Sequence, residues 1–433
     1  MLDYFSAAYT PAAFVHMQDD TASSMSFPAR ASRLWQHAPL YLRIVLALIL
    51  GVLVGLALGP AAGGLGLPGQ LVLRLLGALA PPLILAAIVH ALMTAQLEGA
   101  LTFRLVRLLV LNTLVAISVG LTVANLLEPG AGATVKPPTA VAGHTAQGHA
   151  DPWLTFLDNI PKSLLGPLGD NGKVLGVIVI ALAFGIALRR ERTRPLGTPQ
   201  ELVELFLACL VRILHWVIAI VPLAVFGIVA SVVGTGGFRD FRSLGLFVLS
   251  VIVALLIQAG YYLLRIRFGS WVHPWKAIQG SRDALVMAFS TASSTATMPV
   301  TYACLKERVG LRERSATLGA LVGANFNNDG TALYEAMAAL FVAQMLGLDL
   351  SLAQQLMVVL TSVIASVGAA GIPEAGLVTM TLVFNAVGLP TEYIAILLTV
   401  DWFLDRCRTA INVMGDINVS CLLDGKRREA DPP

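Results

Sequence analysis

Charged and amide side chains interrupt an otherwise apolar stretch near the carboxyl end of the chain, between Val400 and Val419. Successive residues of a helix turn by about 100°, so six of these polar groups fall on one face about 100° wide. The six are Asp401, Asp405, Arg408, Thr409, Asn412 and Asp416. Arg406 points away from that face and needs a different neighbour. Three carboxylates exceed the charge that one arginine neutralises, which favours a binding site over a structural ladder of ion pairs.

A second polar group, Asn325-Phe326-Asn327-Asn328-Asp329-Gly330-Thr331, also lies between apolar flanks. Its amides, its carboxylate and a backbone interrupted by glycine offer oxygen ligands, which suit small hard cations. If the helix resumes after this group, Glu335 lies four residues beyond Thr331 and faces the same interior. A carboxyl group buried there could carry a proton. The alternative for Glu335 is an interfacial residue that faces water.

The composition indicates which elements hold these groups. Of the 433 residues, 56% are hydrophobic and 13% are charged, whereas soluble chains carry about 25% charged residues. We therefore expect an all-α polytopic membrane protein, because membrane-spanning backbone must satisfy its own hydrogen bonds. The net charge of +3 is spread along the chain, so nucleic acid is not expected as a partner. The four cysteines show no metal or disulfide spacing and are interpreted as packing residues.

The apolar runs predict the spans, since a helix needs about 20 apolar residues to cross the hydrocarbon. Six spans are expected in the first part of the chain, within 44–73, 75–97, 108–127, 174–188, 213–238 and 243–264. The arginines that follow the fourth span indicate its cytoplasmic end. Gly51, Gly55 and Gly59 repeat every four residues, which predicts close helix packing.

Two later apolar segments are unlike ordinary spans. Ala284–Leu305 contains seven serine and threonine side chains, and Leu350–Pro373 ends in a stretch interrupted by glycine and proline. Unpaired polar groups are costly in hydrocarbon, and a pair of interrupted segments is typical of the midplane binding site of a secondary transporter. We therefore predict two broken or re-entrant helices. The alternative is that both are merely kinked spans.

These stretches resemble motifs of the dicarboxylate/amino acid:cation symporter family, the glutamate transporters. Residues 401–416 resemble the last transmembrane helix of that family, and residues 327–331 resemble its Asn-Met-Asp-Gly-Thr signature. The run at 293–295 resembles the serine-rich tip of its hairpin 1, and residues 369–373 resemble its hairpin 2. The resemblance covers roughly residues 40–424.

Three positions are similar to one branch of the family, the excitatory amino acid transporters. Arg406 stands in the last helix, while Ala292 stands where archaeal members carry an arginine in hairpin 1. Glu335 matches the glutamate that is linked in that branch to proton carriage and potassium counter-transport. Proton and potassium coupling is therefore a hypothesis for this chain as well.

The resemblance implies an elevator-type homotrimer in the lipid bilayer, with eight transmembrane helices and two re-entrant hairpins in each protomer. The implied domains are a cytosolic leader at 1–36, scaffold helices 1 and 2 at 37–100, transport-domain helix 3 at 101–127, a loop with scaffold helices 4 and 5 at 128–240, the transport domain with helix 6, hairpin 1, helix 7, hairpin 2 and helix 8 at 241–424, and a cytosolic tail at 425–433. Without a long glycosylated external loop, we expect a bacterial inner (plasma) membrane.

Carried over position by position, the resemblance also implies a substrate site. Its residues are Ser293, Ser294, Thr331, Ile372, Gly376, Asp405, Arg408, Thr409 and Asn412. Arg408, with Thr331, would bind the side-chain carboxylate of the substrate. Asp405 and Thr409 would hold the amino group, and Asn412 with the hairpin 1 tip would hold the α-carboxylate. Because a guanidinium fork matches a carboxylate, L-glutamate or L-aspartate is expected as the substrate.

Co-transported sodium is implied at a further set of positions. These are Gly323, Asn325, Asn327, Asp329, Asn412, Asp416, Ser366, Val367, Ala369, Asn112 and Thr113. Asn328 replaces the methionine of the signature, and Leu109 and Asn112 replace a tyrosine and a threonine of the family. These departures leave ion selectivity and stoichiometry open. Glu374 adds a charge to hairpin 2 to which no role is assigned.

Other functions of the same fold stay open at this level. They are a proton-coupled symporter, a symporter of C4-dicarboxylates or neutral amino acids, and a substrate-gated anion channel. Arg408 argues against a neutral amino acid, and Asp405 argues against a plain dicarboxylate. No pairing of a nucleophile with a base is visible, so the chain is not expected to be an enzyme.

Overall fold

The computed structural model describes residues 40–69, 99–131, 198–236, 238–368 and 375–428, with isolated positions between 71 and 89 and between 177 and 181. Backbone contacts divide the chain into two units, Met1–Arg43 and Ile44–Pro433. In the first unit only residues 40–43 are described. Every regular element in the described ranges is a helix, as the composition predicts.

Three described helices are long and apolar enough to cross a membrane. They are Leu42–Gly69, Phe103–Leu127 and Arg242–Gly269, and they coincide with the first, third and sixth predicted spans. Two shorter apolar helices, Ala219–Ser231 and Leu352–Ser366, fall in the predicted fifth span and in predicted hairpin 2. The predicted second and fourth spans lie mostly outside the described residues.

The predicted third span is shorter than the helix that contains it. Helix α5 begins at Gly99 and ends at Leu127, whereas the charge-free run begins only at Leu108. The extra turns carry Arg104, whose Nη2 donates to the carbonyl oxygen of Leu422 at 2.7 Å. Charge thus marks where the apolar run ends, while the helix continues and binds the end of another helix.

Helices α3 (Leu40–Leu58) and α8 (Thr198–Gly236) meet through small residues. A Cβ atom added to Gly51 would lie 2.8 Å from the Phe226 carbonyl oxygen, and one added to Gly55 would lie 2.6 Å from the Ala230 carbonyl oxygen. Only glycine permits so close an approach of two backbones. The predicted close packing at Gly51 and Gly55 is therefore confirmed.

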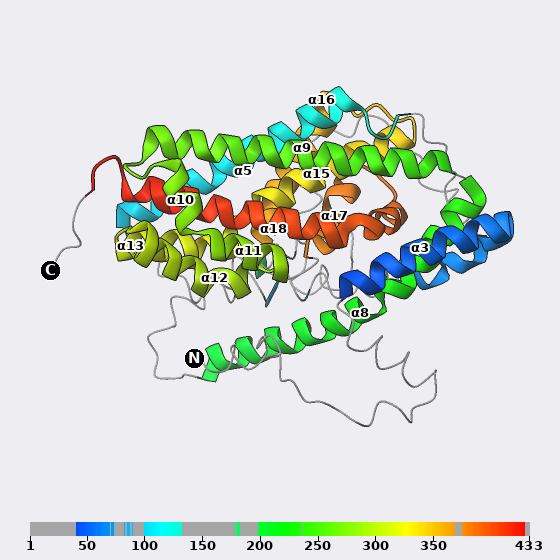
Figure 1. Ribbon diagram of the computed structural model, residues 1–433, viewed down its shortest axis with the longest axis horizontal. Coiled ribbons are helices and arrows are strands. Elements are labelled where there is room, and N and C mark those ends of the chain that lie inside the picture. Colours follow the sequence, from blue (N-terminus) through cyan, green and yellow to red (C-terminus); the bar gives the residue numbers. More distant parts are fainter. Residues whose placement is uncertain are drawn as a thin grey trace. The chain divides into compact units, whose positions relative to one another are not determined.

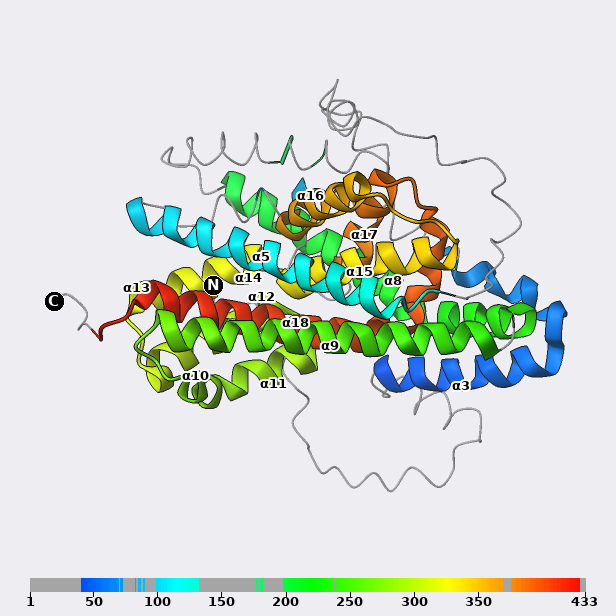
Figure 2. The same ribbon diagram turned by 90° about the horizontal axis from the view of Figure 1, so that it is seen from above.

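Four helices form the packed centre of the second unit. They are α5, α9 (Phe238–Gly269), α15 (Asp329–Met345) and α18 (Ile394–Asp424). Helices α9 and α18 run side by side (Figures 1 and 2), and α15 contacts both of them and α5. All residues of α15 except Gln344 are buried, as is typical of a helix enclosed on every side.

A chain of short helices leads from α9 to α15. In order, they are α10 (Pro274–Gly280), α11 (Arg282–Thr291), α12 (Ser294–Ala303), the π-helical η4 (Cys304–Val309), α13 (Glu313–Ala316), the π-helical η5 (Thr317–Val322) and α14 (Gly323–Phe326). Helices α11 and α12 contact each other across a turn at Ala292 and Ser293. The predicted first interrupted segment is therefore a pair of short helices.

The second interrupted segment is also a helix pair. Helix α16 (Leu352–Gly368) contacts α17 (Ala375–Ala386), and a short 3₁₀ turn, η6 (Thr391–Tyr393), leads on to α18. The junction between α16 and α17 holds the predicted positions Ala369, Ile372 and Glu374, which lie outside the described residues.

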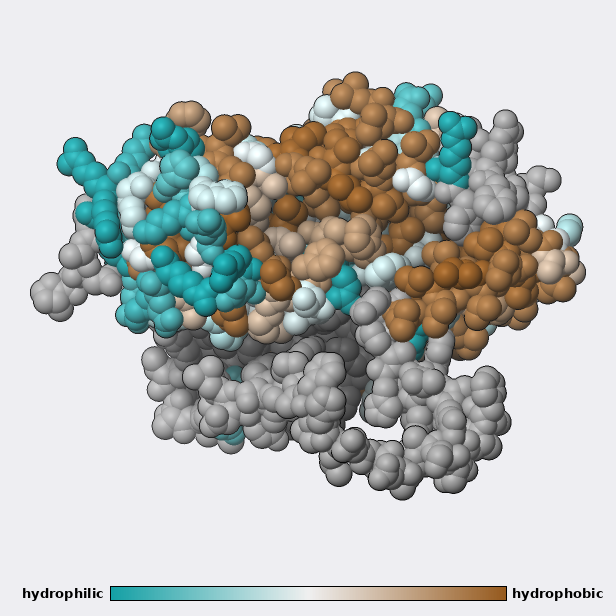
Figure 3. All heavy atoms as spheres, viewed as in Figure 1, coloured by the Kyte–Doolittle hydropathy of each residue, from teal (hydrophilic) through white to brown (hydrophobic). Residues whose placement is uncertain are grey.

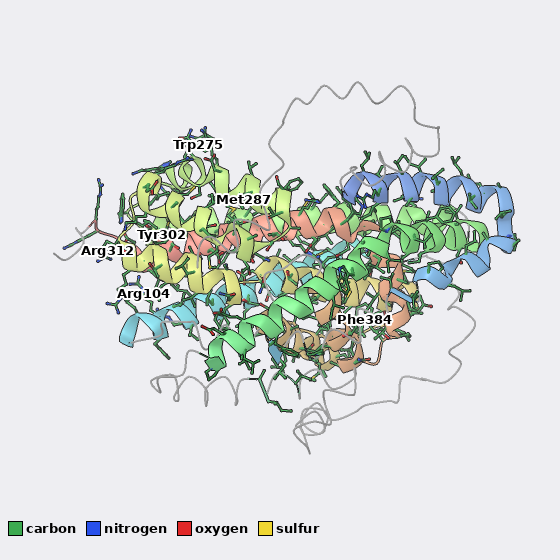
Figure 4. The ribbon with its side chains drawn as sticks, turned by 90° about the horizontal axis from the view of Figure 1, so that it is seen from below. Arg104, Trp275, Met287, Tyr302, Arg312 and Phe384 are labelled. Carbon is green, nitrogen blue, oxygen red and sulfur yellow. The ribbon has the colours of Figure 1, made fainter. Side chains whose placement is uncertain are left out.

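Hydrophilic and hydrophobic residues gather on different elements of the second unit. Figure 3 shows hydrophilic residues over α10 and α13, and hydrophobic residues over the middle of α9. At the same end, Arg312 donates from Nε to Oδ1 of Asp424 at 3.0 Å, and Figure 4 shows Arg104, Tyr302 and Arg312 near the carboxyl end of α18. Charged groups thus gather on the surface at one end of the helix bundle, while the surface over the middle of α9 is apolar.

Two of the cysteines can be placed in the core. Cys304 and Cys421 are buried in one apolar cluster, with Val413 and Ile417. Both thiols are free, in agreement with their interpretation as packing residues. The side chain of Cys209 lies outside the described residues.

Candidate functional site for substrate and cations

The polar face predicted for the last span is buried in α18. Asp401, Asp405, Arg408, Thr409, Asn412 and Asp416 are all buried. Arg406 leaves this face, as predicted, and its Nη1 donates to the carbonyl oxygens of Phe289 and Ser290 in α11. Helix α18 therefore presents one side to the interior and reaches hairpin 1 with a single arginine on another side.

Arg408 is fully buried and shares its charge between two aspartates. Its Nη2 lies 2.9 Å from Oδ1 of Asp401 and 2.8 Å from Oδ1 of Asp405. The guanidinium also lies over the ring of Tyr334, 4.0 Å from the ring centroid. Two carboxylates face one guanidinium, so the cluster is short of positive charge. Both charge-assisted contacts involve the same nitrogen, Nη2, and they fix the orientation of the Arg408 side chain.

On the other side of the guanidinium, Nε and Nη1 of Arg408 are buried and have no hydrogen-bond partner in the part of the chain that the structure describes. A Cβ atom added to Gly376 would lie 3.2 Å from Nη1 and 3.1 Å from Cγ2 of Thr331. Nη1 therefore faces two residues that the sequence assigns to the substrate site. A buried donor without a partner is costly, and an acceptor from a ligand would satisfy it.

Asn412 connects α18 with the start of α15. Its Oδ1 accepts from the backbone nitrogen of Gly330 at 2.8 Å, and its Nδ2 donates to Oδ1 of Asn328 at 3.3 Å and lies 3.5 Å from Oγ1 of Thr331. Residues 327 and 328 are not helical and separate α14 from α15. This interruption places the signature residues against the polar face of α18.

Asp416 and Asn327 form a pocket rich in oxygen atoms. Nδ2 of Asn327 donates to Oδ1 of Asp416 at 3.0 Å and to the carbonyl oxygen of Asn412 at 3.0 Å. Oδ1 of Asn327 and Oδ2 of Asp416 are buried and have no hydrogen-bond partner. Gly323 is necessary here, because a Cβ atom would lie 2.5 Å from Oδ1 of Asp416. Unpaired carboxylate and amide oxygens at close quarters are the ligand set of a small hard cation.

The other acidic group of the predicted ion sites, Asp329, has hydrogen-bond donors on both of its carboxylate oxygens. Oγ1 of Thr113 donates to its Oδ1 at 2.6 Å, and the hydroxyl of Tyr262 donates to its Oδ2. Oδ1 of Asn112, next to Thr113 on α5, accepts a hydrogen bond from Arg265. The carboxylate and amide oxygens of this pocket therefore already have protein donors.

The predicted hairpin 1 tip is bonded to the short helix α14. Ala292 adopts the left-handed conformation at φ +52°, and Oγ of Ser293 accepts from the backbone nitrogen of Ala296 as the cap of α12. Oγ of Ser294 donates to the carbonyl oxygen of Ala324 at 3.1 Å. Both serines are buried, so the tip lies in the protein interior.

Part of the predicted hairpin 2 ion site is described. The carbonyl oxygen of Ser366 accepts from Nδ2 of Asn328 at 3.0 Å, and the side chain of Asn325 bonds the Leu321 carbonyl oxygen at 3.0 Å. Of Val367 only the backbone is described, and Ala369 lies outside the described residues. Asn328 is thus the link between the signature and α16.

Glu335 is fully buried, which excludes the alternative of an interfacial carboxyl group. Its Oε1 accepts from the hydroxyl of Thr379 in α17, and its Oε2 has no hydrogen-bond partner. Thr331, one turn earlier on α15, is buried as well. The predicted inward face of α15 is confirmed for these two residues.

The helices described above lie within the part of the chain that matches one known family. The sequence pattern of the sodium:dicarboxylate symporter family matches residues 40–426. The chain belongs to this family. Its members are symporters and not enzymes, in agreement with the sequence-based expectation.

Individual proteins to which this family member is similar are excitatory amino acid transporters. Excitatory amino acid transporter 1 of Ambystoma tigrinum is 31% identical over 81% of this chain and 75% of its own length. Excitatory amino acid transporter 4 of Rattus norvegicus is 37% identical, over 66% of this chain and 52% of its own length. Excitatory amino acid transporter 2 of Homo sapiens is 43% identical, over 57% and 43%. The chain thus spans about half the length of several relatives that it matches.

The sequence pattern does not indicate three residues that contact the candidate site of this chain, Tyr334, Thr379 and Arg265. Tyr334 and Thr379 are single polar groups in apolar helices, where a hydroxyl gives no distinctive signal. Arg265 directly follows the predicted sixth span, because the apolar run stops at Leu264. Its charge was visible, but the direction of its side chain depends on the neighbouring helix α5.

Proposed function

We propose that this chain is a secondary active transporter that couples the uptake of acidic amino acids, L-glutamate and L-aspartate, to sodium. The observation that carries this proposal is the guanidinium of Arg408, which is buried and half paired. Asp401 and Asp405 hold Nη2, while Nη1 lies beside Gly376, and neither Nη1 nor Nε has a partner among the described residues.

Substrate binding follows from this geometry. The carboxylate of the substrate side chain accepts from Nη1 of Arg408, a charged donor that lies beside Gly376 and has no partner among the described residues. Asp405 lies within the same cluster and accepts from the substrate ammonium group, together with Thr409. Asn412 and the hairpin 1 tip at Ser294 hold the α-carboxylate. A neutral amino acid would leave the Arg408 donors unpaired, which accounts for the preference for acidic substrates.

Sodium binds as a co-transported ion, and the pocket of Asp416, Asn327, Asn412 and Gly323 is its best-supported site. The two unpaired oxygens of Asn327 and Asp416 support this assignment. A second ion binds under hairpin 2, on the backbone carbonyls of Asn325, Ser366, Val367 and Ala369. Binding there favours closure of hairpin 2 over the substrate, so that sodium and substrate bind together.

Glu335 carries a proton in the transport cycle and is linked to potassium counter-transport. Its burial and its unpaired Oε2 support this role. The carboxyl group lies one turn beyond Thr331, so its charge state acts on the substrate site directly. Loading with a proton accompanies the substrate inward, and potassium accompanies the return of the empty carrier.

The transporter works as a homotrimer with an elevator motion in a bacterial inner membrane. Residues 37–100 and 128–240 form the scaffold, and residues 101–127 and 241–424 form the transport domain that carries the whole site. The close glycine packing of α3 on α8 supports a scaffold that moves as one piece. The curated relatives named above come from animals, so the bacterial assignment rests on the lack of a long glycosylated loop.

The test is uptake of labelled L-aspartate and L-glutamate into proteoliposomes that contain the purified protein. An inward sodium gradient is compared with choline, at equal membrane potential, with succinate and L-alanine as competitors. We expect uptake only with sodium and displacement by the acidic amino acids alone. Uptake that ignores sodium, or preferential displacement by succinate or alanine, would contradict the proposal. A current without substrate would indicate the anion channel instead.

A further inference from the structure

Arg265 is a charged residue near the carboxyl end of a candidate membrane-spanning helix, yet its side chain turns inward. The candidate span Arg242–Gly269 contains it, and it is only partly exposed, whereas Arg267 two residues later is exposed. Its Nη1 donates to Oδ1 of Asn112 on α5, and its guanidinium lies over the ring of Tyr261, 5.5 Å from the centroid. An arginine within a span that bonds the bundle interior marks a functional position.

The acceptor of Arg265 belongs to a buried polar network, in which Oε1 of Gln258 has no partner among the described residues. Asn112 is completely buried, and its Nδ2 lies 3.4 Å from Oδ1 of Asn418. Gln258 donates to the backbone oxygen of Asn112 at 3.4 Å, and Nδ2 of Asn418 donates to the backbone oxygen of Tyr262 at 2.9 Å. These contacts fix the Asn112 amide so that its oxygen points at the guanidinium.

The network adjoins the carboxylate of Asp329. Thr113, the residue after Asn112, and Tyr262 each donate a hydroxyl hydrogen to one oxygen of Asp329. Arg265 bonds Asn112, the residue before the Thr113 donor, which brings its positive charge to the same polar network as this carboxylate. Because a buried carboxylate needs a compensating charge, Arg265 supplies to this pocket what a bound cation would supply.

The pocket at Asp416 provides a contrast within the same protein. Oδ2 of Asp416 and Oδ1 of Asn327 are buried without donors, whereas both oxygens of Asp329 and Oδ1 of Asn112 have donors. Of the two pockets, only the one at Asp416 offers free oxygen ligands. A sodium ion entering the other would have to displace Arg265 and would be repelled by its charge.

We propose that Arg265 is the built-in counter-ion of Asp329 and excludes sodium from the pocket of Asn112, Thr113 and Asp329. The positive charge of the Arg265 side chain thus takes the place of the sodium ion that the resemblance implies at this site. The number of sodium ions that accompany each substrate is then lower by one. This inference rests on the proposed sodium coupling.

The experiment measures the coupling ratio in proteoliposomes, as the substrate gradient that just balances a set sodium gradient. Arg265→Met removes the charge at similar length, Arg265→Lys keeps it, and Arg267→Met is the matched control. We expect Arg265→Met to gain about one sodium ion per substrate, and Arg265→Lys and Arg267→Met to match the parent. An unchanged ratio in Arg265→Met overturns the inference. Absence of sodium-driven uptake in the parent would instead contradict the proposed function.

A second measurement does not depend on transport. The melting temperature of the detergent-purified protein is followed against sodium concentration, because the slope reports the number of ions bound to the folded state. Arg265→Gln, which keeps a donor for Asn112 but no charge, is compared with Arg265→Met and the parent. A steeper sodium dependence in both uncharged variants supports the inference. Parallel slopes in all three proteins overturn it.

Discussion

At the scale of single residues, the proposed substrate preference depends on which nitrogens of the Arg408 guanidinium bond the protein and which remain available to a ligand. Asp401 and Asp405 hold one nitrogen of the guanidinium, and Tyr334 stacks beneath it. This arrangement orients the fork and leaves its remaining donors toward Thr331 and Gly376. Lysine has the same charge but a single point donor, so it cannot bond two aspartates and a substrate carboxylate with this geometry.

Arg408→Lys is therefore expected to lower kcat/KM for L-aspartate about 10- to 100-fold. The reason is the loss of at least one hydrogen bond to a charged group, which contributes about 1.5–3 kcal/mol. Initial rates of sodium-driven uptake over a range of aspartate concentrations provide the measurement. Arg267→Lys, at an exposed position of α9, is the control. Equal values of kcat/KM for Arg408→Lys and the parent would refute the assignment of this arginine to the substrate.

At the scale of elements, the site exists because helices are interrupted where the substrate and ions bind. The break at residues 327 and 328 separates α14 from α15, and Ala292 separates α11 from α12. Each break frees backbone groups in the interior, which the neighbouring helices then satisfy. Asn328 is an example, because its amide donates to the Ser366 carbonyl oxygen of α16 and accepts from Asn412 of α18.

Asn328→Met is expected to weaken the link between the signature and hairpin 2. Loss of a neutral hydrogen bond costs about 0.5–1.5 kcal/mol, so the apparent KM for aspartate should rise about 2- to 10-fold. Uptake kinetics at saturating sodium measure this change. Asn385→Met, at an exposed position of α17, serves for comparison. A lower KM would mean that Asn328 holds hairpin 2 away from its closed position.

Gly55→Ala is expected to destabilise the packing of α3 on α8. The new methyl group would lie 2.6 Å from the Ala230 carbonyl oxygen, and overpacking of this kind costs about 1–3 kcal/mol. The melting temperature of the purified protein should fall. Gly245→Ala is the matched substitution, because nothing lies within 4 Å of its added methyl group. Equal melting temperatures for the two variants would show that α3 can move away from α8 at little cost.

At the scale of the whole molecule, coupling requires that groups from distant parts of the chain share one interior. Glu335 of α15 meets Thr379 of α17, and Asp329 meets Thr113 of α5. The two buried carboxyl groups of α15 thus contact helices that are far apart in the chain, α5 and α17. A change in the protonation of a buried carboxyl group can shift the balance between two conformations of a protein.

Glu335→Gln is expected to remove the dependence of uptake on pH and on internal potassium. The amide keeps an acceptor for Thr379 but carries no exchangeable proton or charge. In the parent, an inward proton gradient should accelerate uptake, and internal potassium should accelerate it further. Both accelerations are measured in proteoliposomes beside Glu313→Gln, which changes an exposed carboxyl group paired with Lys306. A variant that keeps both responses would place proton and potassium coupling elsewhere.

Much of this protein could be predicted from the sequence. The low share of charged residues determined that it is helical and enters a membrane, because hydrocarbon does not tolerate unpaired polar backbone. Helical periodicity identified the inward face of α18, from Asp401 to Asp416, and the outward direction of Arg406. Both predictions hold because they depend only on the repeat of one helix.

Tertiary structure decided which of the polar groups are paired. The sequence could not show that Asp401 and Asp405 share one nitrogen of Arg408 while Gly376 lies beside another. Asn112 was predicted as an oxygen ligand, yet its oxygen accepts from Arg265 across two helices. Pairing of this kind depends on distances between elements far apart in the chain. A sequence pattern specifies the face on which a charge lies, but only packing decides which partner neutralises it.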